Sequence, residues 1–189
     1  MQKTWFAART IALALFVAIS AGIFAPGGAF AELKSKAEID AGVKDTLHKF
    51  YKEFPGGRDL VAKAAGTLVF PHITKGGFIV GGEYGEGALV VGGKTAGYYN
   101  SASASIGFQA GLQSRSQLII FMTEKALKEF RDVDGWQAGV DASVTLIDQG
   151  ASGKLNTDTI KQPVIGVVFG AKGLMGGISL DGTKISKIH

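Results

Sequence analysis

The stretch that decides the fold class is Ser101–Gln113, which reads SASASIGFQAGLQ. Small polar residues or glycines alternate here with apolar residues over all thirteen positions. A period of two places successive side chains on opposite faces of a β-strand. The pattern predicts one long strand with a buried apolar face, which carries Ala102, Ala104, Ile106 and Phe108, and a small polar face opposite it.

Shorter runs on both sides of this stretch also predict strands. Alternation returns from Trp136 to Ile147, with one side formed by Val140, Ala142, Val144 and Leu146. Other apolar runs predict strands at residues 67–70, 77–84, 88–91, 118–122, 164–169, 174–180 and 183–188. Pro71 is expected to end the first of these strands, a tight glycine turn to separate 77–84 from 88–91, and Asp181-Gly182 to form a hairpin turn. The short connections favour antiparallel pairing.

Glycine is unusually frequent in this chain. It accounts for 28 of 189 residues, about 15% against an average near 7%. Eleven of these glycines lie between Gly76 and Gly111. Because glycine inside a strand marks a bulge, a sharp bend or the close approach of another backbone, we expect strongly bent strands in a small barrel or coiled sheet.

Helical periodicity is confined to three places. Residues 33–54 predict an amphipathic helix that ends at Pro55-Gly56-Gly57, and residues 59–65 predict a second, short helix. Thr123 can cap a third helix over 124–130. The predicted fold is therefore α+β: a glycine-rich, mainly antiparallel and strongly bent β-sheet or barrel-like body, with N-terminal amphipathic helices and one inserted short helix.

Residues 1–31 have the layout of a cleaved secretory signal peptide. Lys3 and Arg9 precede an apolar run over 11–24, and Ala29-Phe30-Ala31 forms an A-x-A cleavage signal. A retained membrane anchor is the alternative, but the run is short for a span of about 20 residues. We expect export, to the periplasm in a cell with two membranes, of a single domain over 32–189 that is soluble or peripheral on a membrane.

Composition excludes several classes of protein. The absence of cysteine excludes a disulfide scaffold, a zinc ribbon, a thiol nucleophile and a lipid-modified cysteine. The formal charge of +4 falls to +2 without residues 1–31, because eighteen basic and sixteen acidic residues remain. This balance, without an arginine-rich stretch interleaved with aromatic residues, gives no reason to expect a nucleic acid as partner.

The sequence motifs that could indicate catalysis mostly lack the neighbouring structure or the spacing that catalysis requires. Residues 88–95 resemble a phosphate loop, but strand-like residues follow Lys94-Thr95 where that mechanism needs a helix. Glu83 and Glu86 could form a glycosidase carboxylate pair, but two glutamates in one glycine turn more often form a solvated rim. The three histidines show no metal spacing and no catalytic order. We expect no enzymatic activity, no cofactor and no metal site, although a hydrolase would regain support if Glu83, Glu86 or Asp141 converged in a pocket.

A series of ordered motifs resembles the SYLF domain family. The resemblance spans roughly residues 35–188, and its bacterial branch has secreted members of this layout. The blocks that carry it are Thr67–Pro71, Thr74–Phe78, Val80–Gly87, Gly92–Thr95, Gly97–Tyr99, Ser101–Ser105, Gly111, Phe121–Thr123, Asp134–Trp136, Gly139–Asp141, Phe169–Gly170, Lys172–Leu174 and Gly182–Ile185.

The resemblance implies a lipid-binding module. Eukaryotic members bind phosphoinositides, in part through an N-terminal amphipathic helix and basic residues, and some bind actin, which we do not expect an exported bacterial protein to meet. We therefore expect the chain to bind an anionic phospholipid or membrane surface. Headgroup contacts are predicted for Lys44, Lys49, Lys52, Arg58 and Lys75, and insertion, if the first helix is free, for Leu47, Phe50 and Phe54.

Two alternatives stay open. The first helix can instead pack its aromatic residues on the sheet. The whole domain can instead be a structural or protein-interaction module of the cell envelope that binds another envelope protein and no lipid.

Overall fold

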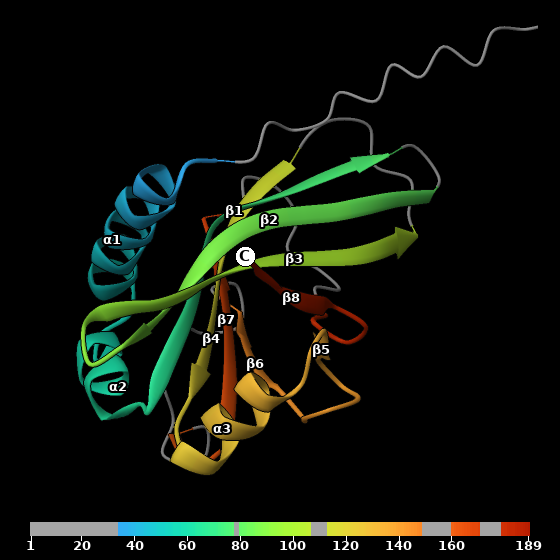
Figure 1. Cartoon of the computed structure of the whole chain (residues 1–189). Coiled ribbons are helices and arrows are strands. Elements are labelled where there is room, and N and C mark those ends of the chain that lie inside the picture. Colours follow the sequence, from blue (N-terminus) through green and yellow to red (C-terminus); the bar gives the residue numbers. More distant parts are fainter. Residues whose placement is uncertain (1–33, 78–79, 107–112, 149–159, 171–178) are drawn as a thin grey trace, which may run out of the picture. The chain divides into compact units, whose positions relative to one another are not determined.

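The computed structural model describes residues 34–77, 80–106, 113–148, 160–170 and 179–189. Lys34–His189 form one compact unit, and the predicted signal peptide lies outside the described residues. The elements within the described ranges (Figure 1) are α1 (Lys36–Glu53), α2 (Gly57–Lys63), β1 (Gly66–Gly77), β2 (Val80–Val91), β3 (Lys94–Ile106), β4 (Gln113–Phe121), α3 (Glu124–Asp132), β5 (Trp136–Gln137), β6 (Thr145–Asp148), β7 (Val164–Phe169) and β8 (Lys184–Ile188).

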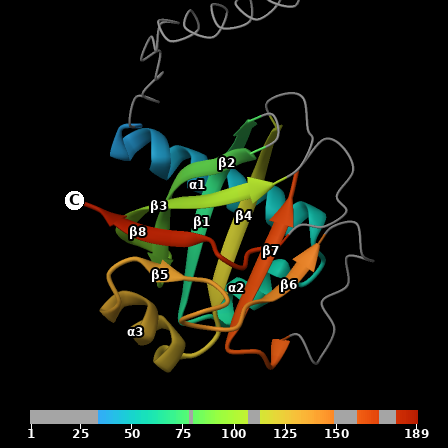
Figure 2. The ribbon, with the colours of Figure 1, turned by 90° about the vertical axis from the view of Figure 1, so that its right-hand side faces the viewer.

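All of these strands belong to one eight-stranded sheet with the order β5-β8-β3-β2-β1-β4-β7-β6. Neighbouring strands are antiparallel except for the parallel pair β6–β7. Figure 2 shows that the sheet is strongly twisted, that α1 and α2 lie against one face, and that α3 lies on the other side, near one end of the strands. The predicted α+β class with a bent, mainly antiparallel sheet is confirmed.

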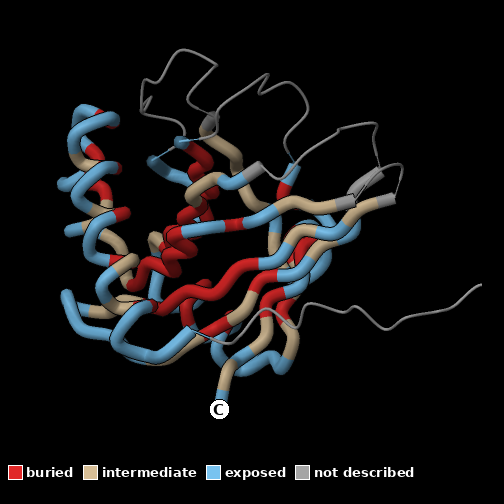
Figure 3. Tube along the Cα trace, turned by 90° about the horizontal axis from the view of Figure 1, so that it is seen from above, coloured by how far each residue is buried: buried red, intermediate tan, exposed pale blue. Residues whose placement is uncertain are grey.

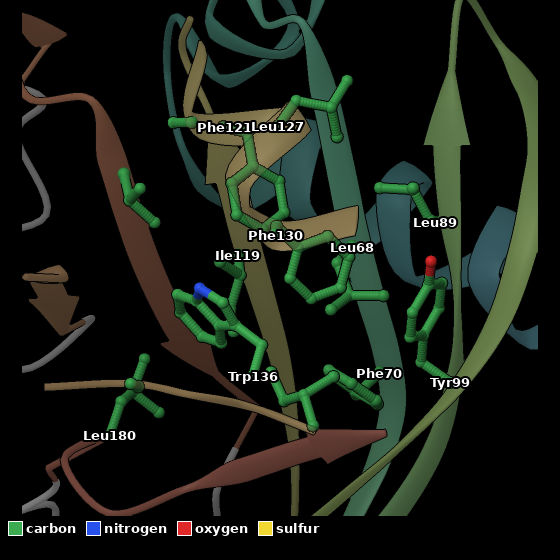
Figure 4. Close-up of a cluster of buried hydrophobic side chains, with 14 of the residues drawn as sticks. Leu68, Phe70, Leu89, Tyr99, Ile119, Phe121, Leu127, Phe130, Trp136 and Leu180 are labelled. Carbon is green, nitrogen blue, oxygen red and sulfur yellow. The ribbon is translucent and has the colours of Figure 1, made fainter. Parts of the chain in front are cut away.

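The centre of the sheet is buried on both faces. Along β4, Leu118 and Ile120 face α1 and α2, whereas Ile119 and Phe121 face the opposite side. The second side holds an aromatic core, defined here by the packed rings of Tyr99, Phe121, Phe130 and Trp136 (Figure 4), with ring centroids 4.7 Å apart for Phe121–Phe130 and 5.0 Å apart for Tyr99–Phe130. Successive side chains of a central strand such as β4 alternate between two apolar cores. Its apolar run therefore has no polar face.

The strand boundaries around the glycine-rich region differ from the prediction. Pro71 does not end the first strand but lies at a register shift inside β1, and 77–84 and 88–91 are not separated by a turn. A bulge accommodates the proline, which has no N–H to donate to the ladder. Opposite the bulge β2 passes very close to β1: a Cβ on Gly87 would lie 2.1 Å from the carbonyl oxygen of Val69.

At residues 101–104 the alternation has the opposite sense from the one predicted. Ser101 is buried and Ser103 is half-buried, whereas Ala102 and Ala104 are exposed. The serines share the face of Tyr99, which points into the aromatic core, and this parity decides their burial. Residues 107–112 of the predicted strand lie outside the described residues.

In the C-terminal half, the strands and turns of the structure differ in part from the predicted ones. Residues 136–147 form two short strands, β5 and β6, and Val140 is exposed in the turn between them. Asp181-Gly182 does form a turn, with Gly182 at φ +79°. The strand that follows, β8, pairs with β3 and β5, and most of the predicted strand 174–180 lies outside the described residues.

Candidate functional site: the basic face of the first two helices

The first helix is anchored at its N-terminus by a capping box. Ser35 Oγ accepts a hydrogen bond from the backbone N–H of Glu38, and the Glu38 carboxylate accepts one from the backbone N–H of Ser35 at 2.8 Å. The preceding residue, Lys34, donates its backbone N–H to Glu86 Oε2 at 3.0 Å, which ties the start of α1 to β2. The helix therefore begins at a defined place on the sheet.

The apolar face of α1 is packed against the sheet. Phe50 is 0% exposed and Phe54 is 1% exposed, and both rings lie within 6 Å of the Phe169 ring centroid on β7. Leu47 is half-buried against the same core. The helix is not free in this fold, so the condition under which these three residues were expected to enter a membrane is not met. The alternative that α1 packs its aromatic residues on the sheet describes the structure.

The outer side of α1 and α2 carries the predicted cations. Lys44, Lys49, Lys52 and Arg58 are exposed, and no described carboxylate forms an ion pair with any of them. We call these four residues the outer basic face. Figure 3 shows α1 with its buried residues turned toward the sheet and its exposed residues turned away from it. Exposed acidic residues, Asp45, Glu53 and Asp59, lie on the same two helices and reduce their net charge.

Two residues beside the outer basic face, Tyr51 and His72, interact with its positive charges. The guanidinium of Arg58 lies over the ring of Tyr51, 4.6 Å from its centroid, in a cation–π contact. Burial, followed by the positive charges of Lys34 and Lys49, lowers the pKa of His72 on β1. The charged form of this histidine is disfavoured partly because Lys49 is close to it.

The fifth predicted cation, Lys75, lies elsewhere. Its ammonium is 4.0 Å from the carboxylate of Glu83, which also accepts two hydrogen bonds from the Arg115 guanidinium at 2.6 and 3.0 Å. These residues lie on the β1, β2 and β4 side that faces away from α1, because Lys75 shares the face of Ile73 in the aromatic-core side of the sheet. The structure does not bring Lys75 together with the outer basic face.

The carboxylates considered for catalysis do not converge. Glu83 and Glu86 are three residues apart in one continuous strand and therefore point to opposite faces of the sheet. Glu86 is buried and accepts a hydrogen bond from the Tyr84 hydroxyl, and burial followed by this bond raises the pKa of Tyr84 to about 12. Asp141 accepts a hydrogen bond from the backbone N–H of Gln137 in a turn. These three carboxylates do not converge in a pocket, so the hydrolase hypothesis gains no support from them.

The phosphate-loop resemblance is also resolved by geometry. Gly92 and Gly93, at φ +56° and +77°, form the tight turn between β2 and β3, and Lys94-Thr95 begin a strand rather than a helix. Positive φ at both positions explains the glycine pair.

Sequence reasoning missed a polar cleft on the other side of the sheet. Its lining comes from α3, β3 and β8, and its volume is about 340 Å³. The residues that line it are Ala96, Tyr99, Glu124, Leu127, Lys128, Arg131, Asp132 and Lys187. Arg131 and Lys187 are far apart in the sequence, and only the pairing of β3 with β8 brings them together, so no local pattern could have indicated this site.

Two general features of the described ranges bear on function. No helix there is long and apolar enough to cross a membrane. Within the same ranges, no group of three or more His, Asp or Glu residues is placed to hold a metal ion.

Comparison with known proteins gives one family. Residues 102–188 match the family model Ysc84, which is described as "Las17-binding protein actin regulator". The matched part runs from β3 to β8, whereas α1, α2 and the motif blocks before Ala102 lie outside it. No curated protein matches the chain.

Proposed function

We propose that the chain is a non-enzymatic binding protein that adsorbs to anionic phospholipid, and the match of residues 102–188 to the Ysc84 (SYLF) family model supports a binding role. The description of that family concerns binding and regulation, which supports a binding role. The anionic phospholipid and its contact surface are our own inference from the residues of α1 and α2.

The observation that carries the proposal is the outer basic face itself. Lys44, Lys49, Lys52 and Arg58 are exposed and free of ion pairs with described carboxylates, while the apolar residues of α1 are buried or, like Leu47, half-buried. A surface of this kind attracts an anionic bilayer electrostatically, with about 1 kcal/mol per cation near the membrane. It has no exposed apolar stripe to insert, so binding is peripheral and weakens as salt rises.

Location in the cell envelope is part of the same proposal. A protein released after residue 31 into the periplasm would face bilayers rich in anionic lipid, which the outer basic face suits. An actin partner, as the family description suggests for other members, does not fit this location.

The proposal is tested by co-sedimentation with phosphatidylglycerol vesicles at low salt. We compare the parent protein with the variant Lys44→Gln/Lys52→Gln. The matched control is Lys125→Gln/Lys184→Gln, which removes the same charge from α3 and β8. Losing two cations is expected to weaken binding by roughly 30-fold, from about 1 kcal/mol each, and the control should bind like the parent.

Two results would overturn the proposal. The parent protein could stay in the supernatant at low salt, or the control could lose as much binding as the α1 variant. In the first case, cross-linking to a specific envelope protein would favour the alternative of a protein-interaction module.

A further inference from the structure

The cleft between α3 and the β3–β8 pair is built from residues that face one another. Tyr99 on β3 is the direct register partner of Lys187 on β8, so both side chains stand on the same face of the sheet. Glu124, Leu127, Lys128 and Arg131 recur at helical spacing and form one stripe of α3 toward the cleft. Tyr99 also packs on Phe130, which fixes α3 over this part of the sheet.

Some of the charged residues that line the cleft form an ion pair with each other, and others do not. Lys128 donates to the carboxylate of Asp132 one helical turn away, so these two charges offset each other. Arg131 and Lys187 line the same cleft, and neither forms an ion pair with a described carboxylate. Two cations that form no ion pair with a described carboxylate therefore line one cleft, from elements that the sequence separates widely.

The chemistry of these groups suits a phosphate group. A guanidinium presents paired N–H donors that match two phosphate oxygens, and an ammonium adds a second positive charge. Tyr99 also lines the cleft and carries a hydroxyl; burial raises its pKa and the nearby Arg131 partly offsets this, so it remains a donor at neutral pH. Leu127 and Ala96 supply apolar contact beside these groups.

The geometry points to a second binding site: we propose that Arg131, Lys187 and the Tyr99 hydroxyl bind the phosphate group of a phosphate ester in the cleft between α3, β3 and β8. The site is separate from the outer basic face and does not depend on membrane adsorption. Glu124 lies seven residues from Arg131, about 10 Å along the helix. Its carboxylate repels a second phosphate and accepts hydrogen bonds from hydroxyl groups, which favours an ester with one phosphate and a hydroxylated remainder.

The experiment is calorimetric titration of the full chain with glycerol 3-phosphate, with inorganic phosphate and with inositol 1,4-bisphosphate at low salt. The cleft variant is Arg131→Gln/Lys187→Gln. The matched control, Lys125→Gln/Lys184→Gln, removes two charges from the same α3 and β8 outside the cleft. We expect saturable binding of glycerol 3-phosphate that weakens at least about tenfold in the cleft variant, stays within about twofold in the control, and exceeds that of the bisphosphate.

The outcomes separate the possibilities. Equal affinity for inorganic phosphate would support the site with free phosphate as its ligand, whereas preference for the ester would support a headgroup. Absence of saturable binding to all three probes, or equal losses in the cleft variant and the control, would overturn the proposal. The Lys44→Gln/Lys52→Gln variant should bind glycerol 3-phosphate normally, so failure of membrane adsorption and failure of this site can be told apart.

Discussion

Replacing Gly87 with alanine should remove a large part of the protein's free energy of unfolding. Gly87 lies in β2 opposite the β1 bulge, and an added Cβ would lie 2.1 Å from Val69 O and 2.7 Å from Phe70 Cδ1. Real Cβ contacts essentially never fall below 3.0 Å, so the two strands would have to separate by nearly 1 Å. The backbone of Gly87 has an ordinary φ, and the cost is therefore steric rather than conformational.

The expected loss can be built from the local structure. Separation of β1 from β2 weakens the ladder around the Val69–Ala88 and His72–Glu86 pairs, where each lost hydrogen bond costs about 1 kcal/mol. Overpacking of the neighbouring core adds about 1–3 kcal/mol. Alanine restricts the unfolded chain and returns only about 0.4–1 kcal/mol. We expect a net loss of about 3–5 kcal/mol, a large part of a typical stability of about 5–15 kcal/mol.

Urea unfolding, followed by far-ultraviolet circular dichroism and by the fluorescence of buried Trp136, measures this loss. A loss of this size lowers the midpoint by about 2 M urea for a slope near 2 kcal/mol/M. The control is Gly82→Ala in the same strand, where the nearest atom to the new Cβ is Ser103 O at 3.7 Å. That variant should stay within about 0.5 kcal/mol of the parent protein.

The reasoning would be refuted by a Gly87→Ala variant that is within about 1 kcal/mol of the parent protein. Equal losses in the two variants would also refute it, because they would show that glycine matters in β2 for a reason other than the approach of β1.

Two further predictions concern contacts described above, and a third concerns the predicted signal peptide. Ser35→Ala should destabilise the fold by about 1 kcal/mol in the same urea assay, because it removes the N-cap of α1; an unchanged midpoint would contradict this role. Tyr84 should ionise near pH 12 in a phenolate absorbance titration, and Tyr84→Phe should remove that component. Its raised pKa adds stability that is complete below about pH 10 and lost as pH rises toward 12, so parent and variant should converge there. N-terminal sequencing of exported protein should begin at Glu32, and recovery of a chain that still carries Met1 would contradict cleavage after Ala31.

The secondary structure could be predicted wherever a local signal was strong. The helical spacing over 33–54 located α1 within three residues, Thr123 caps α3 as expected, and the apolar run at 164–169 is β7. Local signals failed where a neighbouring strand decided the outcome. Pro71 and Gly85–Gly87 look like breaks in the sequence, yet they lie inside continuous strands because the bulge and the glycines face each other across the β1–β2 pair.

The candidate site divides in the same way. Exposure of Lys49 and Lys52 could be predicted, since charges on the polar side of an amphipathic helix remain in water. Lys44 lies at the edge of that side and Arg58 lies on α2, so the same argument did not reach them. The place of Lys75 could not, because its contact with Glu83 depends on the register of β1 against β2. The common place of Arg131 and Lys187 in one cleft could not be predicted either, because it depends on the pairing of β8 with β3.

The sequence by itself determined that this chain is an α+β protein with a bent, glycine-rich sheet, because the periodicity of side chains and the turn preferences of glycine are local properties. It also carried the motifs that resemble the SYLF family, whose model matches residues 102–188. Only the tertiary structure decided that Phe50 and Phe54 are core residues rather than a membrane-inserting surface, since an amphipathic helix presents the same apolar stripe to a sheet or to a bilayer. The physical reason is that burial and pairing are properties of distant segments brought into contact, which no single stretch of sequence contains.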